Sequence, residues 1–273
     1  MDQINFKKKT GLVFLIVLLS IGLAYAQTQN ENHNPNPKPS ELFHIPYVSS
    51  GTLNSPTLFL VLHGDAPFNN PSYQYGIARQ IANENNNVVA VGVLRPGYTD
   101  NEGNRSKGER GYTTGDNYTK EVLESIHNLT ADLKKKYNPS KIILVGHSGG
   151  AAISANLIAQ YSNTYSKAVL VSCPCDLHLW RKHMKGLQPE ARIWDIEVTS
   201  LSPIEVLDSI DSSIEIVVVH GEDDKTVPLN IASKYVKALK ENNKKVNFVI
   251  LENRGHEIAF NNKIFEIIKA LVE

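Results

Sequence analysis

The stretch Lys141–Ala152 reads KIILVGHSGGAA, and we expect it to decide the fold of the chain. It begins with an apolar run, which is typical of a strand buried on both faces of a parallel sheet. A G-x-S-x-G pattern follows around Ser148, and small residues suited to a helix start come directly after it. Strand, tight turn and helix together predict a nucleophile elbow, which raises the seryl oxygen at the carboxyl edge of the sheet. The alternative is an ordinary glycine-rich turn between a strand and a helix.

Outward from this stretch, apolar runs rich in β-branched residues alternate with helical patterns. The predicted strands are Thr57–Leu62, Val88–Leu94, Lys141–Val145, Lys167–Val171, Ile214–Val219 and Val246–Leu251. The predicted helices are Tyr73–Asn83, Asn117–Tyr137, Gly149–Tyr161, Leu229–Glu241 and Glu257–Val272. This alternation predicts a single α/β domain with a mostly parallel sheet and helices on both faces. Phe43–Ser50 is a candidate antiparallel strand at one edge.

The alternation is interrupted between Cys173 and Ser213, where about 40 residues contain both tryptophans and no strong strand pattern. An insertion at this point follows the predicted strand Lys167–Val171. We therefore expect a small cap over about residues 173–213.

The N-terminus has the three parts of a secretory signal peptide. A basic group, Lys7–Lys9, precedes the apolar run Leu12–Leu23, and Ala24–Ala26 supplies an A-x-A cleavage site. The apolar run is shorter than the roughly 20 residues of a membrane span, although an uncleaved anchor is the alternative. Residues 27–40 contain no aliphatic side chain and predict a disordered leader. We expect the protein to be exported to the periplasm or the extracellular space, with no stable membrane insertion after signal cleavage.

Composition is that of a folded protein, because 41% of the 273 residues are hydrophobic. Lys and Arg together number 28, as do Asp and Glu, so the formal net charge is zero. A neutral chain has no overall field that attracts polyanions, which disfavours nucleic acid as a partner.

The two cysteines, Cys173 and Cys175, flank a single proline and have His178 and His183 nearby. Disulfides are common in exported proteins, but a bridge across one residue would be strained by the Cα separation that disulfides prefer. The spacing C-x-C-x2-H-x4-H does not match common zinc sites. We therefore expect free or oxidisable thiols here and no bound metal.

A seryl hydroxyl is a poor nucleophile unless a base takes its proton, and histidine is the usual base. His256 is the best placed, because it follows the strand Val246–Leu251 and precedes the last helix. His63 and His220 also end strands, and we expect each to be a structural imidazole that bonds loop backbone. His147 lies inside the elbow, and we expect its side chain to point away from the nucleophile.

An acid that orients the base is expected after the strand Ile214–Val219, where three carboxylates follow one another. Asp224 is the first choice, because it lies four residues after His220 and shortly before Pro228, a spacing typical of the acid-bearing loop of serine hydrolases. Asp223 is the second choice, and Glu222 is the third.

From Leu58 to the C-terminus the chain resembles an α/β-hydrolase. The motifs that carry the resemblance are VLHGD at Val61–Asp65, VGHSGGA at Val145–Ala151, HGEDDKTVP at His220–Pro228 and RGHE at Arg254–Glu257. The order Ser148, Asp224, His256 is also that of this superfamily. Within it the chain is similar to small enzymes of the dienelactone-hydrolase and prolyl-oligopeptidase-domain kind, with Ser148 where dienelactone hydrolases have cysteine. The resemblance implies a single-domain α/β-hydrolase fold over residues 41–273.

The resemblance also implies an oxyanion hole made by the backbone N–H groups of Gly149 and Asp65. A carboxylate beside an oxyanion is unfavourable unless its side chain points away. Arg95 and Tyr98, at the end of a strand, either line the substrate site or hold their loop, with Arg95 paired to an acid such as Asp100.

Together these residues predict a serine hydrolase that cleaves a small ester through an acyl-enzyme. Ser148 is the expected nucleophile, His256 the base and Asp224 the acid that orients it. The alternatives are a serine peptidase or amidase of the prolyl-oligopeptidase-like kind and a catalytically idle binding protein with the same fold. We expect no cofactor, and the expected partner is a small-molecule ester or a short peptide.

Overall fold

The computed structural model describes residues 41–272 of the chain. The predicted signal peptide, residues 1–26, and the predicted leader, residues 27–40, lie outside the described residues and stay predictions. Within the described residues, no helix combines the length and the apolar character that crossing a membrane requires.

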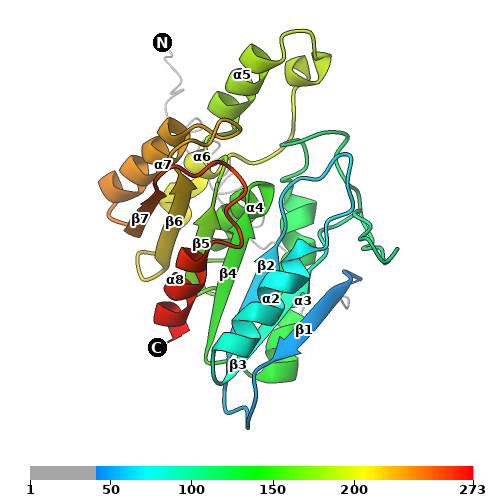
Figure 1. Ribbon diagram of the computed structural model, residues 1–273, viewed down its shortest axis with the longest axis vertical. Helices are drawn as coiled ribbons and strands as arrows, with labels where there is room; N and C mark the ends of the chain where they lie inside the picture. Colours follow the sequence, from blue (N-terminus) through cyan, green and yellow to red (C-terminus); the bar gives the residue numbers. More distant parts are fainter. Residues whose placement is uncertain (1–40, 273) are drawn as a thin grey trace, which may run out of the picture. The chain divides into compact units, whose positions relative to one another are not determined.

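Seven strands form one sheet in the order β1-β3-β2-β4-β5-β6-β7 (Figure 1). β1 runs antiparallel to β3, and every other pair of neighbours is parallel. The strands are β1 (His44–Val48), β2 (Thr57–Leu62), β3 (Val88–Val93), β4 (Lys141–His147), β5 (Lys167–Val171), β6 (Glu215–Gly221) and β7 (Lys245–Leu251). The predicted fold class, a mostly parallel α/β sheet, is confirmed.

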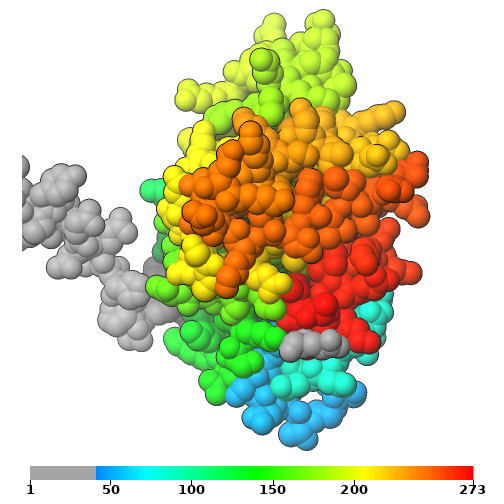
Figure 2. All heavy atoms as spheres, turned by 90° about the vertical axis from the view of Figure 1, so that its left-hand side faces the viewer, coloured from blue at the N-terminus to red at the C-terminus, as the bar shows by residue number. Residues whose placement is uncertain are grey.

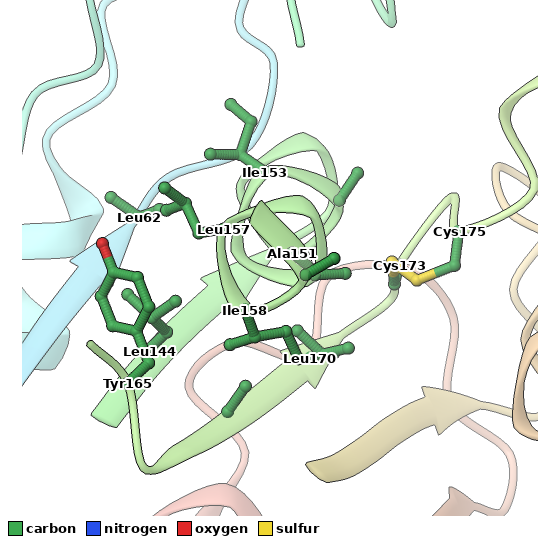
Figure 3. Close-up of a cluster of buried hydrophobic side chains, with 14 of the residues drawn as sticks. Leu62, Leu144, Ala151, Ile153, Leu157, Ile158, Tyr165, Leu170, Cys173 and Cys175 are labelled. Carbon is green, nitrogen blue, oxygen red and sulfur yellow. A yellow bond between two sulfur atoms is a disulfide. The ribbon is translucent and has the colours of Figure 1, made fainter. Parts of the chain in front are cut away.

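Helices cover both faces of the sheet, which explains why the central strands are apolar along their whole length. Along β2, Leu58, Leu60 and Leu62 belong to the same buried cluster as residues of α3, α4 and α7, whereas Phe59 and Val61 belong to a second cluster with residues of α2 and α8. Figure 3 shows the first of these two cores around α4. The helices are α2 (Tyr73–Glu84), α3 (Lys120–Tyr137), α4 (Gly149–Gln160), α7 (Leu229–Glu241) and α8 (Asn262–Val272).

β1 forms one edge of the sheet. The N–H of Leu94 donates to the carbonyl of Phe43 at 2.9 Å, and the N–H of Ser49 donates to the carbonyl of Val88 at 3.0 Å. Hydrogen-bonded positions alternate along an antiparallel strand. The odd-numbered residues of β1 therefore bond β3, and the backbone of Pro46 faces away from the sheet.

The last helix begins at Asn262, five residues after the predicted start at Glu257. The N–H of Ile258 donates to the carbonyl of His256 at 3.0 Å, and that of Asn261 donates to the carbonyl of Ile258 at 2.8 Å, so turns occupy this segment. Ile258 and Ala259 are buried like residues of a helix. For this reason the apolar pattern alone did not separate the turns from the helix.

The cap segment, residues 173–213, divides into two parts. Its elements are α5 (Leu177–Leu187), η1 (Arg192–Asp195), α6 (Pro203–Val206) and η2 (Leu207–Ser209). α5 and η1 lie beyond the carboxyl ends of the strands (Figure 1), and this part of the surface projects at the top of Figure 2, whereas α6 and η2 contact α4. Only the first part of the segment therefore projects from the sheet.

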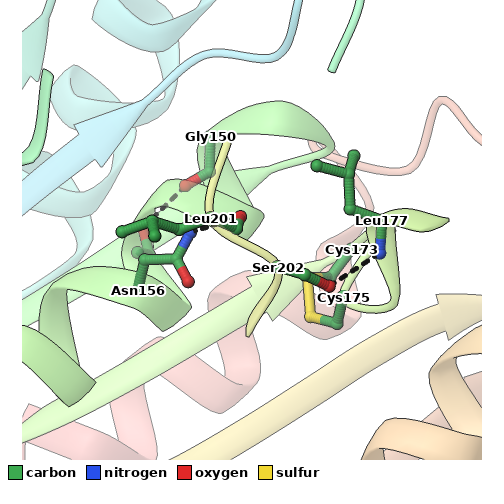
Figure 4. Close-up of a disulfide and its surroundings, with 8 residues drawn as sticks. Gly150, Asn156, Cys173, Cys175, Leu177, Leu201 and Ser202 are labelled. Carbon is green, nitrogen blue, oxygen red and sulfur yellow. Dashed lines mark hydrogen bonds between the residues drawn. A yellow bond between two sulfur atoms is a disulfide. The ribbon is translucent and has the colours of Figure 1, made fainter. Parts of the chain in front are cut away.

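Cys173 and Cys175 form a disulfide, so the expectation of free thiols is wrong. An extended chain would place these Cα atoms about 7 Å apart, but a bend at Pro174 brings them to 5.1 Å. This separation lies within the range of about 4.4–6.8 Å that disulfides adopt. Both cysteines are fully buried next to α4 and the segment around Ser202 (Figures 3 and 4).

Candidate active site

Ser148 occupies a tight turn between β4 and α4, with a backbone φ of 51°. A positive φ is unfavourable for a residue with a side chain, and such strain is concentrated at functional sites. A Cβ atom at Gly146 would overlap the backbone of Gly150 and Ala151, so this approach of strand and helix requires glycine. The local structure is the elbow that the sequence predicts.

The turn brings Ser148 together with His256 and Asp224, which come from the loops after β7 and β6. The Oγ atom of Ser148 lies 3.0 Å from Nε2 of His256, and Nδ1 of His256 lies 2.8 Å from Oδ2 of Asp224. The other carboxylate oxygen of Asp224 accepts the N–H groups of Thr226 and Val227, at 2.9 and 2.8 Å. This is the nucleophile, base and orienting-acid geometry of a serine hydrolase.

The Asp224 carboxylate is held in its charged form. Burial alone would raise its pKa, but hydrogen bonds from His256 and the N–H of Val227 outweigh burial and keep the pKa below its ordinary value. Asp223 and Glu222 are exposed and do not reach His256. Of the three carboxylates that the sequence offered, the structure brings Asp224 to the imidazole.

His63 and His220 bond loop backbone, as expected. Nδ1 of His63 donates to the carbonyl of Gly64 at 2.7 Å, and Nε2 accepts the N–H of Arg95 at 3.0 Å. Burial and the neighbouring Arg95 charge keep the pKa of His63 well below its usual value, so the ring is neutral. Nε2 of His220 lies 2.7 Å from the carbonyl of Val227, on the acid-bearing loop.

Asp65, whose N–H is a predicted oxyanion-hole donor, has its side chain fully engaged. Oδ1 lies 2.8 Å from Nη1 of Arg95, and Oδ2 accepts the hydroxyl of Tyr118 at 2.7 Å and the N–H of Gly115 at 2.8 Å. Arg95 is itself buried, with its guanidinium over the rings of Tyr98 and Tyr118. Arg95 thus neutralises the carboxylate beside the elbow.

Arg95 pairs with an acid, as expected, but this acid is Asp65 and not the suggested Asp100. Asp100 instead accepts the hydroxyl of Tyr75 at 3.0 Å and bonds from Asn104. The identity of the acid could not be read from the sequence, because Asp65 lies 30 residues from Arg95, in the loop after a different strand. The burial of Arg95 also removes it from the group of residues that can line an open substrate site.

The role of His147 was missed by the sequence analysis. Its ring is buried, its Nε2 lies 3.2 Å from the carbonyl oxygen of His256, and its Nδ1 lies 2.8 Å from the hydroxyl of Tyr73. The Oγ of Ser172 donates to the same His256 carbonyl at 2.9 Å. No pattern in the sequence signals these contacts, since Tyr73 lies 74 residues away from His147.

His147, His256 and Glu257 place three potential metal-ligand atoms within 4.8 Å of one another. Both ring nitrogens of each histidine are already within hydrogen-bonding distance of Tyr73, Ser148, Asp224 or a carbonyl. Hydrogen bonds within the protein therefore account for all four ring nitrogens of the two histidines.

A family comparison matches residues 97–273 to the prolyl oligopeptidase family. Two curated relatives are acylamino-acid-releasing enzymes, from Rattus norvegicus (22% identical over 141 residues) and from Homo sapiens (25% over 142 residues). Each alignment covers 46% of this chain and only 19% of the relative, so this chain corresponds to a small part of those enzymes.

Solved structures with the same fold include esterases and peptidases. Est1E from Butyrivibrio proteoclasticus, solved with ferulic acid bound, has a TM-score of 0.62 and 15% identity, covering 84% of this chain and 93% of its own. The acylaminoacyl peptidase of Pyrococcus horikoshii has a TM-score of 0.60 and 14% identity, covering 87% of this chain and 41% of its own. At this level of identity the likeness establishes the α/β-hydrolase fold.

Proposed function

Since the chain belongs to the prolyl oligopeptidase family and is a serine hydrolase of the esterase or peptidase type, we propose that it cleaves small esters through an acyl-enzyme. The observation that carries this proposal is the Ser148, His256 and Asp224 set, joined by contacts of 3.0 and 2.8 Å. A binding protein would have no need for all three groups in this arrangement.

Each residue has a defined part in the proposed mechanism. Nε2 of His256 takes the proton from Ser148 as Oγ attacks the ester carbonyl, and Asp224 stabilises the resulting imidazolium. His256 then gives this proton to the leaving alcohol, and water repeats the sequence to release the acid. The N–H groups of Gly149 and Asp65 are the proposed donors to the oxyanion. The pairing of Asp65 with Arg95 reduces the repulsion that a free carboxylate would exert there.

One consideration favours a small ester over a peptide. Of the cap segment, only α5 and η1 project beyond the strand ends, so the cap offers little surface to enclose a long substrate. Likeness in fold does not favour either class, because the esterases Est1E and PE8 share the fold over 93% and 98% of their lengths and the proline iminopeptidase of Mycobacterium smegmatis over 94%. The peptidase alternative is supported by the sequence likeness to acylamino-acid-releasing enzymes.

A fluorophosphonate probe tests the nucleophile directly. The folded protein should form one covalent adduct, located by mass spectrometry on Ser148, and Ser148→Ala should form none while its thermal midpoint stays within a few degrees. An unlabelled wild-type protein would end the enzyme proposal and favour the idle binding protein.

A substrate panel separates the two candidate functions. We expect p-nitrophenyl esters to have higher kcat/KM values than aminoacyl- and N-acyl-aminoacyl-nitroanilides. Higher kcat/KM values for the nitroanilides would assign the protein to the peptidases.

We also propose that the protein is exported, on the basis of the sequence of residues 1–26. The mature protein recovered from the periplasm or the medium of a producing cell should begin at Gln27. A protein that retains Met1 and stays in the cytoplasm would contradict export.

A further inference from the structure

The carbonyl of His256 is the meeting point of three hydrogen bonds. It accepts the N–H of Ile258 at 3.0 Å and the Oγ of Ser172 at 2.9 Å, and it lies 3.2 Å from Nε2 of His147. His147 directly precedes the nucleophile, so this contact joins the elbow to the backbone that carries the base. The position of the imidazole of His256 therefore depends on a residue that does not touch the substrate.

The chemistry of the partners fixes the direction of these bonds. A carbonyl only accepts, so Nε2 of His147 carries the proton and donates it. Burial, with a smaller contribution from the charge of His256, lowers the pKa of His147 to about 4, so the ring is neutral and Nδ1 is an acceptor. The hydroxyl of Tyr73 lies 2.8 Å from Nδ1 and must therefore be the donor in that bond.

The hydroxyl of Tyr73 has a second partner on the opposite side of the site. It accepts the N–H of Gly64 at 2.5 Å, on the loop that carries Asp65. This loop lies against the nucleophile, since a Cβ atom at Gly64 would come within 3.0 Å of the Cβ of Ser148. A bond to the Gly64 N–H fixes the His63–Gly64 peptide plane, which is one peptide before the plane that holds the N–H of Asp65, a proposed oxyanion donor.

These contacts form one directed chain, from the N–H of Gly64 to Tyr73, from Tyr73 to His147, and from His147 to the carbonyl of His256. We infer that Tyr73 and His147 are positioning residues. They hold the loop after β2, which carries Asp65, and the loop after β7, which carries His256, at fixed positions on either side of Ser148. The inference rests on the proposed function. Neither side chain contacts the reacting atoms, so their effect is on geometry, where a displacement of about 1 Å can reduce a rate by about 100-fold.

Tyr73→Phe removes only the hydroxyl that joins the two loops. We expect kcat to fall by about 10-fold to 100-fold, because the loops lose their common anchor. KM should stay within about two-fold, because Tyr73 does not touch the substrate. Tyr235→Phe is the matched control, since Tyr235 is also buried and its hydroxyl has no hydrogen-bond partner within the described residues. A kcat for Tyr73→Phe within two-fold of wild type would overturn the inference.

Two substitutions of His147 test its two hydrogen bonds, to Tyr73 and to the carbonyl of His256, separately. His147→Asn keeps an acceptor at the depth of Nδ1 but no longer reaches His256, whereas His147→Gln keeps a donor at the depth of Nε2 but removes the acceptor for Tyr73. Both should lower kcat, and His147→Gln should retain more of it if the bond to His256 matters most. If Tyr73→Phe fails to fold, the two His147 variants test the inference in its place, and a wild-type kcat in both of them would overturn it.

A double-mutant cycle shows whether the two residues act as one unit. If they do, Tyr73→Phe combined with His147→Asn should lose about as much kcat as His147→Asn alone. If the losses in kcat multiply, the two residues act independently, and this result would overturn the inference that they form one hydrogen-bonded series. All variants should still be labelled at Ser148 by the fluorophosphonate probe. Absence of labelling in the wild type would instead contradict the proposed function.

Discussion

Asp223 and Asp224 are neighbours in the sequence, and only the second carboxylate reaches the imidazole of His256. The difference arises from the turn after β6, in which the N–H groups of Thr226 and Val227 close onto Asp224 and direct it inward. Asp223 projects from the same turn into solvent. Of these two adjacent residues, Asp224 is therefore buried and Asp223 is exposed.

Asp224→Asn should lower kcat by about 10⁴, because an amide does not hold the reactive tautomer of His256. Asp223→Asn is the matched control, with the same chemical change one residue away, and it should have a small effect. Steady-state kinetics of the two variants side by side provide the test. A larger loss for Asp223→Asn would mean that the orienting acid has been misassigned.

The buried imidazole of His147 makes stability dependent on pH. Its pKa is about 4 in the folded protein and 6.5 in the unfolded chain, so below pH 6.5 the unfolded chain binds a proton that the folded protein does not. The free energy of unfolding should therefore fall as the pH drops from 6.5 to 4, by up to about 3 kcal/mol from this group. His63, whose pKa is also lowered by burial, contributes in the same direction.

Urea unfolding at pH 7, 5.5 and 4 measures this dependence. His147→Gln, which cannot titrate, should show a shallower loss of stability than wild type over the same interval. Equal slopes for the two proteins would show that His147 does not titrate in this way.

The positions of the strands could be predicted closely from the sequence, whereas the long-range contacts between side chains could not. β2, β5 and α7 have the predicted boundaries, because β-branched runs and helical spacing are local signals. Asp224 could be chosen from spacing within one loop. The links from Arg95 to Asp65 and from Tyr73 to His147 join residues that are 30 and 74 positions apart in the sequence, and only the folded chain brings those side chains together. Likewise, the Cys173–Cys175 disulfide depends on a bend that residue type alone did not reveal.

Arg181 joins the projecting part of the cap segment to the rest of the molecule. Its Nη2 donates to the carbonyls of Ile193 and Ile196, at 2.8 and 3.0 Å, and its Nη1 to that of Thr114 at 3.4 Å. The guanidinium also lies over the ring of Trp194. One side chain on α5 thus bonds both the η1 region and the long loop before α3.

Arg181→Met should increase amide hydrogen exchange around residues 190–198, because the carbonyls that Arg181 holds lose their donor. Exchange in the sheet should be unchanged. Lys182→Met is the matched control, since the next side chain of α5 is exposed. Equal protection of this segment in both variants would show that Arg181 does not hold the cap.

The size of the cap segment sets an expectation for the size of the substrate. Its second half contacts α4, and its buried residues, including Leu177, Trp180 and Trp194, are part of the core. What remains above the strand ends can cover a modest apolar pocket and offers little surface to shield a long acyl chain.

We therefore expect a preference for short acyl esters, about C2 to C6, over long-chain esters. A series of p-nitrophenyl esters with increasing acyl length should show kcat/KM falling beyond about C6. A steady rise in kcat/KM from C4 to C16 would reject this expectation and would indicate a lipase.

The outward-facing backbone of Pro46 bears on how copies of this protein meet in a concentrated solution. A strand of another molecule that approached β1 would need N–H donors along the exposed edge, and proline has none. β1 is five residues long, so the missing donor falls at its centre. Short edge strands interrupted by proline are one means by which β-proteins avoid edge-to-edge aggregation. Pro46, on the edge strand β1, thus disfavours the pairing of this sheet with a strand of a second molecule.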